Sequence, residues 1–183
     1  MTESVRLIKK LLKRSHEHRR RRRWPWIVLG CFLVIIGIAT TVYLVSTAPL
    51  REAKADAFEV AQKEKNIVSV SDFYYYNGIK DKYSVIVGPN NKKQETAVFV
   101  PRGVKGKYAN KTISYLMKDG ITKEKAIEIV EKEKSPSKIL TTHLGMDEGT
   151  PIWEISYRKA DGTLNYLEIN FITGSWYRQI NNL

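Results

Sequence analysis

The sequence predicts an α+β protein with one N-terminal membrane helix, followed by two copies of a small unit. In each unit we expect a helix packed on a curled antiparallel sheet of three to four strands. An uncharged segment begins at Trp24 and ends at Ala48. After it, a helical pattern followed by strand-like runs occurs twice, at residues 50–100 and 121–180. An internal repeat of this order is typical of tandem α+β units.

The apolar segment directly follows five consecutive arginines, Arg19 to Arg23. Residues 27–45 provide about nineteen uncharged residues, which is enough to cross the hydrocarbon core of a bilayer. Positive charge beside such a span favours the cytoplasmic side. We therefore expect a single-pass protein of the cell membrane, with a basic cytoplasmic tail (1–23), a transmembrane helix (24–48) and an extracellular C-terminal part.

The positive charge of the chain is concentrated in this tail. The net charge is +12 over 183 residues, and residues 1–23 carry +8 of it. Because only +4 remains for the rest of the chain, the charge argues against nucleic-acid binding and favours attraction of the Arg-rich tail to anionic inner-leaflet lipids. Residues 4–14 also have the pattern of a basic amphipathic helix on the headgroups, with a solvated tail as the alternative.

Two alternatives would remove the apolar segment as a signal peptide. Cys31, the only cysteine, follows too short an apolar stretch to be a lipidated terminus. Residues 46–48 have the small-x-small form of a signal-peptidase site, but Pro49 after the cut fits a protease substrate poorly. The sequence therefore favours an uncleaved anchor. Without cysteine, the exported part has no disulfide, cysteine–zinc site or cysteine nucleophile.

The first unit covers residues 49–101. We expect Pro49 to end the membrane helix and residues 50–66 to form a separate helix with a small apolar face. The three expected strands lie at residues 67–76, 83–87 and 95–100, with turns at Asn77-Gly78 and at residues 88–91.

A linker, residues 102–120, is expected to contain one or two helical turns at 112–118. The second unit covers residues 121–183, and Thr122 is placed to cap a helix that ends near Lys134. Turns at Asp161-Gly162 and Thr173-Gly174 separate further strands, which we expect at residues 138–144, 152–159, 163–171 and 175–180. The alternating side chains that should pack on the helix are Trp153, Ile155, Tyr157, Leu167, Ile169 and Phe171.

Three segments of the second unit resemble the PepSY domain: residues 120–127, 152–157 and 169–175. Asn170 stands where that family commonly has an aspartate. From about Trp24 to the end, the whole layout is similar to the TseB-type cell-wall elongation regulators, with two tandem cystatin-like modules of which the second is PepSY-like. This resemblance implies a regulator without catalysis or cofactor that positions a class B penicillin-binding transpeptidase, the enzyme that crosslinks peptidoglycan.

PepSY-like modules also resemble protease propeptides, so the alternative is a membrane-anchored inhibitor or modulator of a surface peptidase. An inhibitor should present a loop or an edge strand to the active site of its target. Residues 145–150 are the only segment of the sequence that obviously fits such a loop.

Candidate catalytic residues are few. The Ser-x-x-Lys pattern of penicillin-binding enzymes occurs twice, beginning at Ser135 and at Ser156. The first match ends a predicted helix and the second lies in a predicted strand, whereas that nucleophile should open a helix. His143 is the only histidine after the membrane span, and Asp147-Glu148 and Asp161 fall in predicted turns. The sequence thus predicts no catalytic and no metal site.

An excess of aromatic residues suggests a protein interface. Residues 73–76 place aromatic rings on both faces of one strand, and tyrosine is common at interfaces. We therefore predict Tyr74, Tyr76 and Tyr166 as partner-binding residues. The alternative is that one face of the strand fills the core of its own unit while the other packs against the second unit.

An intact anchor should keep the full-length chain in the membrane. We expect a C-terminal tag to be removed by protease added outside intact protoplasts, and an N-terminal tag to be protected, because the arginine run holds the N-terminus inside. Immunoblotting of both tags measures this. Release of a shortened product into the medium would instead show cleavage after Ala48.

Overall fold

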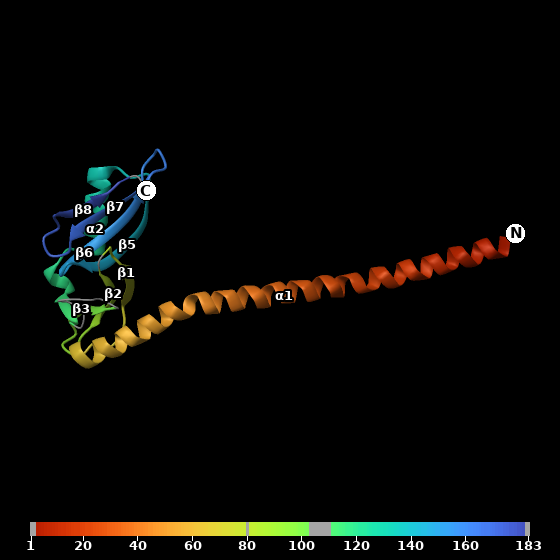
Figure 1. Ribbon diagram of the computed structural model, residues 1–183, viewed down its shortest axis with the longest axis horizontal. Coiled ribbons are helices and arrows are strands. Elements are labelled where there is room, and N and C mark those ends of the chain that lie inside the picture. The colour runs from red at the N-terminus through yellow and green to blue at the C-terminus, as the bar shows by residue number, and fades with distance from the viewer. Residues whose placement is uncertain (1–2, 80, 103–110, 182–183) are drawn as a thin grey trace. The chain divides into compact units, whose positions relative to one another are not determined.

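The structure is a computed structural model that describes residues 3–79, 81–102 and 111–181, with side chains from residue 24 onward. The element order is a long helix α1 (Glu3–Lys65), four strands, a second helix and four more strands (Figure 1). The chain divides into two compact units, Met1–Pro49 and Leu50–Leu183. This architecture confirms the predicted fold class, an α+β protein with a long N-terminal apolar helix and two antiparallel sheets.

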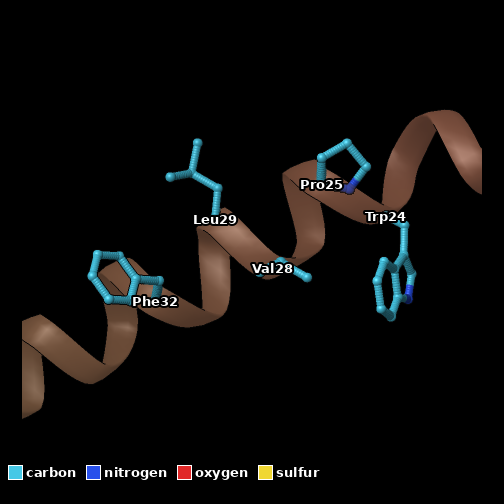
Figure 2. A pocket seen from close by; sticks show the side chains of 5 residues that line it. All are labelled: Trp24, Pro25, Val28, Leu29 and Phe32. Carbon is cyan, nitrogen blue, oxygen red and sulfur yellow. The ribbon is translucent and has the colours of Figure 1, made fainter.

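Within the described residues, α1 is the one helix long and apolar enough to cross a membrane. Its large apolar side chains are exposed, including Ile27, Phe32 and Ile38 at 57–60 % of their full surface. Figure 2 shows some of them projecting from the helix around a shallow, wholly apolar pocket (Trp24, Pro25, Val28, Leu29, Phe32). A helix that is apolar all round suits a lipid environment. The side chains of the basic tail lie outside the described residues, so the predicted lipid contacts stay a prediction.

The expectation that Pro49 ends the membrane helix is wrong. Helix α1 continues through both Pro25 and Pro49 to Lys65. A proline inside a helix removes one N–H donor and crowds the carbonyl four residues earlier, but the other backbone hydrogen bonds of the helix persist. The predicted helix at residues 50–66 is therefore the last part of α1.

The first sheet is an antiparallel meander in the order β1 (Asp72–Asn77), β2 (Lys82–Pro89), β3 (Glu95–Pro101) and β4 (Ile113–Leu116). Strand β4 corrects the expectation of helical turns at residues 112–118: only Met117–Asp119 form a turn of 3-10 helix. Alternation explains the strand, because Tyr115 faces the core and meets the Phe99 ring edge-on at 6.0 Å between centroids.

The second sheet has the order β5 (Lys138–Asp147), β6 (Thr150–Arg158), β7 (Leu164–Asn170) and β8 (Trp176–Ile180). Helix α2 (Lys123–Lys134) contacts β5 and β6. As predicted, Thr122 caps it: the Thr122 hydroxyl accepts from the backbone N–H of Lys125 at 3.2 Å. The Trp153 indole donates to the carbonyl of Ile121 at 3.0 Å. This places the predicted helix-facing side chains of β6 beneath α2.

The first sheet has a different neighbour on each face. On one face, Ile86 and Val98 pack with Ala57 and Ala61 of α1. On the other face, side chains of β1 to β3 join those of the second sheet and α2 in a single hydrophobic core. This shared core contains Tyr74, Tyr76, Tyr83, Val85, Val87, Ala97 and Phe99 of the first module and Leu144, Trp153, Ile155, Leu167, Ile169 and Phe171 of the second. The expectation that the two modules pack together is confirmed.

Strand β5, at the edge of the second sheet, is the main contact with the first module. It lies against β1 and β2, so this edge is covered rather than left to pair with other chains. The approach is closest at Gly145, where an added Cβ would stand 2.4 Å from Cδ2 of Tyr76. A hydrogen bond from the backbone N–H of Glu148 to Oδ2 of Asp81, at 3.2 Å, links the modules further.

Replacing Gly145 by alanine should therefore destabilise the protein. The Tyr76 ring is 1 % exposed and cannot move away, and overpacking of this kind costs about 1–3 kcal/mol. Chemical denaturation of the full chain in detergent, followed by tryptophan fluorescence, measures the cost.

Two variants make this test specific. Lys138→Ala, an exposed position on the same strand, should change stability by less than about 0.5 kcal/mol. Combining Gly145→Ala with Tyr76→Leu should cost less than the sum of the single changes, because the clash disappears. Full additivity would contradict the contact between the modules.

Candidate functional site

One residue from each strand of the second sheet contributes to a row of ionisable side chains, His143, Glu154, Glu168 and Arg178, which we call the charged row. His143 pairs with Glu154, Glu154 with Glu168, and Glu168 with Arg178. Directly opposed residues of antiparallel strands project from the same face. They alternate with Trp153 and Ile155, so the charged row lies on the face opposite to α2, which we call the open face.

Arg178 neutralises two carboxylates at once. Its Nε donates to Oε2 of Glu168 at 2.9 Å, and a terminal nitrogen donates to Oδ2 of Asp147, at the end of β5. Both carboxylates are at most 5 % exposed. Buried carboxylates require such partners, since a charge removed from water without one is very costly. Arg178 thus forms its ion pairs with Asp147 and Glu168.

Glu154 is left without a counter-ion. It takes part in none of the ion pairs of the described residues, and it lies directly opposite Glu168. Burial raises the pKa of the Glu154 carboxyl to about 7, and the negative charge of Glu168 adds to the increase. The pKa of Glu168 is also raised by burial, although Arg178 opposes that change. The open face therefore holds a carboxylate that is protonated in part at neutral pH.

The neighbouring histidine does not compensate this charge. Burial lowers the pKa of His143, and the ammonium of Lys123 lowers it further. The His143 ring lies against Tyr74, with 6.4 Å between the ring centroids. His143 is therefore neutral near pH 7. With Asp147 included, three carboxylates share one guanidinium.

Tyr76 of the first module reaches the same group of charges. Its ring lies on Gly145, two residues from His143 along β5, and its hydroxyl is buried with no hydrogen-bond partner among the described residues. Burial raises its pKa far above the ordinary value, and the charges of Glu168, Glu154 and Asp147 raise it further. One oxygen of Asp147, Oδ1, likewise has no described partner. The side of the charged row next to Tyr76 thus contains two unsatisfied buried polar atoms.

The three predicted partner-binding residues separate into two groups. Tyr74 and Tyr76 are 8 % and 1 % exposed and belong to the core shared by the modules; the Tyr74 ring meets Trp153 edge-on at 5.8 Å. The alternative drawn from the sequence was that one face of this strand packs against the second unit. Tyr74 and Tyr76 lie on that face of β1. Tyr166 is partly exposed on the open face, paired with Ser156 and Ile180. Its contact with a partner stays a prediction.

The serines of the two Ser-x-x-Lys matches have structural positions. Ser135 follows the last residue of α2 with φ 44°, a left-handed cap conformation. Ser156 is 4 % exposed, and its hydroxyl lies 2.6 Å from that of Thr141.

Within the described residues, no group of three His, Cys, Asp or Glu side chains is placed to hold a metal ion.

Sequence reasoning missed the charged row. Asp147 was expected to act in a turn, but it ends β5 as a buried ion-pair acceptor, because the turn itself is formed by Glu148 and Gly149 with positive φ. A signal was present: Glu154 and Glu168 each stand between core residues on strands that were predicted to be neighbours. Charged residues in the middle of two adjacent strands indicate an ionic cluster or an exposed face.

Comparisons with known proteins agree with the two-module architecture. Residues 56–101 match the family described as "Cell wall elongation regulator TseB-like domain", and residues 120–175 match "Peptidase propeptide and YPEB domain", the PepSY family. The chain is 28 % identical over 149 residues to the probable cell wall elongation regulator TseB of Bacillus subtilis, covering 81 % of this chain and 89 % of that protein. The solved structure of the YpmB protein from Bacillus subtilis is 29 % identical, with a TM-score of 0.62 over 69 % of this chain and 95 % of that one. The predicted resemblance is thereby confirmed.

Glu154→Gln should stabilise the protein above neutral pH. The folded-state pKa of Glu154, about 7, exceeds its ordinary value of 4.5, so its contribution to stability is present below about pH 4.5 and is lost as the pH rises through about 7. One pKa unit corresponds to about 1.4 kcal/mol. After allowance for the partial exposure of Glu154, we expect a gain of about 1–3 kcal/mol at pH 8.5.

Denaturation of the full chain and of Glu154→Gln in detergent, at several pH values, measures this gain. The contributions of Glu168 and of His143, whose sign is opposite, are common to both proteins and largely cancel in the difference. An equal stability difference at pH 5 and at pH 8.5 would rule out a buried, uncompensated Glu154.

Proposed function

We propose that this chain, which carries a TseB-like domain followed by a PepSY domain, is a membrane-anchored extracellular protein that binds and positions a class B penicillin-binding transpeptidase during cell-wall elongation. The observation that carries the proposal is the combination of these two domains with an apolar helix able to cross a membrane. Similarity to a cell wall elongation regulator over most of the chain supports the regulatory role.

The proposed topology places the N-terminus in the cytoplasm. The arginine run before Trp24 supports this orientation, and its positive charge suits the anionic lipids of the inner leaflet. The modules would then lie beside the extracellular domains of other anchored proteins. Attachment to one membrane raises the effective concentration of two such partners, so a modest contact surface suffices for binding.

The proposed function involves no catalysis by this chain. The candidate nucleophile and base have structural neighbours: the Ser156 hydroxyl lies against that of Thr141, and the His143 ring lies against Tyr74. Regulation by binding requires only a surface that fits the partner.

Control of a surface peptidase is the second candidate, favoured by the description of the PepSY family as a peptidase propeptide domain. The structure gives this candidate little support at the segment expected to act as an inhibitory loop. Of residues 145–150, Gly145 is buried against Tyr76, Met146 lies in the shared core, and Asp147 is buried in its ion pair with Arg178. Only the tip at Glu148 is exposed. An inhibitory loop that enters an active site must be accessible over several residues.

Capture from membranes tests the proposed function. The full-length tagged chain is purified from crosslinked membranes of cells exposed to a fluorescent penicillin, which marks transpeptidases covalently. We expect a class B enzyme to be recovered and identified by mass spectrometry. A matched control carries an unrelated transmembrane helix and no extracellular modules.

Three outcomes would contradict the proposal. Recovery of cytosolic proteins alone would exclude the extracellular location and the partner together. Recovery of a surface peptidase without any penicillin-labelled protein would favour the second candidate. Equal labelling in the control would show that capture depends on membrane proximity rather than on the modules.

A further inference from the structure

Among the described residues, the three carboxylates of this group share a single guanidinium, and Glu154 has no ion-pair partner. Asp147, Glu154 and Glu168 lie on one face of the sheet, and Arg178 bonds Asp147 and Glu168. Like charges directly opposite each other on antiparallel strands destabilise a sheet, and Glu154 is opposite Glu168. Because no further cation pairs with Glu154 among the described residues, protonation of Glu154 relieves its repulsion with Glu168. A positively charged side chain of another protein would neutralise the ionised Glu154 directly.

The buried hydroxyl of Tyr76 is a second, independent sign that the group is incomplete. It is 1 % exposed and has no described hydrogen-bond partner, and the charges of Glu168, Glu154 and Asp147 act on it. Its oxygen lies beside Gly78, where an added Cβ would stand 2.7 Å away. A buried polar group next to the charged row is thus unsatisfied among the described residues.

Glu154 is accessible from outside, unlike Asp147 and Glu168. It is partly exposed, and the next row on the open face consists of Thr141, Ser156, Tyr166 and Ile180. Thr141 is exposed, and Tyr166 and Ile180 are partly exposed. A carboxylate beside an accessible aromatic ring fits an arginine or lysine side chain, which can pair with the acid and lie over the ring.

We infer that the open face of the second sheet is the docking surface for the partner protein, and that Glu154 pairs there with an arginine or lysine side chain of that partner, which lies against Tyr166. Charge complementarity carries the inference: Glu154 has no ion-pair partner among the described residues, and a basic side chain of the partner supplies one. The inference rests on the proposed function and names the part of the chain that performs it.

Docking of this kind depends on pH. The groups facing Glu154 are Glu168 and Arg178 across the sheet, His143 on β5, Asp147 at the end of that strand, and Tyr76 from the first module. Of these, Arg178 keeps its charge throughout. Ionisation of Glu154 is required for pairing, so binding should strengthen as the pH rises from about 6 to about 8.

The capture experiment on full-length chains in membranes tests the inference with three variants. Glu154→Gln keeps the shape of the side chain but removes its charge, and Glu154→Lys reverses the charge. Glu131→Gln, at an exposed position on α2, is the matched control. We expect penicillin-labelled transpeptidase to fall about tenfold or more with Glu154→Gln, to fall further with Glu154→Lys, and to be unchanged with Glu131→Gln.

A second measurement locates the contact without altering the charge. A photo-reactive phenylalanine analogue at position 166 should crosslink to the partner, because the side chain remains aromatic and partly exposed. Sequencing of the crosslinked peptide identifies the basic residue of the partner. Changing that residue to glutamate should abolish capture, and combining this change with Glu154→Arg should restore it.

The failures of the two proposals are distinguishable. If the unaltered chain captures no transpeptidase, the proposed function fails, and this inference fails with it. If the unaltered chain captures the enzyme and Glu154→Gln captures as much at every pH, only the docking surface is wrong. Loss of capture after digestion of the cell wall would show that wall material occupies the face, and would also overturn the inference.

Discussion

The packing of the first sheet against the edge and the core of the second module is the interaction on which the rest of Leu50–Leu183 depends. Each module has one helix and four strands, too little to bury a large core alone. The helix α1 covers one face of the first sheet, so the other face of that sheet needs a neighbour. The second module packs against this other face, and its edge strand β5 is covered by β1 and β2.

This contact also determines which parts of the second sheet remain accessible. Helix α2 takes one face and β1 takes the edge at β5, while Tyr76 covers Gly145 at one side of the open face. On the open face, Glu154 and Tyr166 remain partly exposed, whereas Ser156, opposite Tyr166, is buried. The carboxylate of Glu154 lowers the stability of the isolated protein at neutral pH, and proteins commonly retain such features where they bind a partner.

Several elements could be predicted because their signals are local. These signals depend on neighbouring residues in the sequence. The structure contains the apolar helix, the helix cap at Thr122 and the turns at Gly162 and Gly174. Strand β4 could not be predicted in this way. Its four residues are too short a run to identify a strand from sequence, and they form one because β3 pairs with them and Phe99 offers a ring for Tyr115.

The sequence by itself determined the membrane anchor, the α+β class and the two modules, since hydrophobic length and periodicity are properties of consecutive residues. Only the tertiary structure decided that Tyr74 and Tyr76 are buried, because burial depends on a second module more than sixty residues away. It alone brought His143, Glu154, Glu168 and Arg178 into one row, since strand register sets which charges meet. Arg178 pairs with Glu168 and Asp147, and Glu154 has no ion-pair partner in the part of the chain that the structure describes.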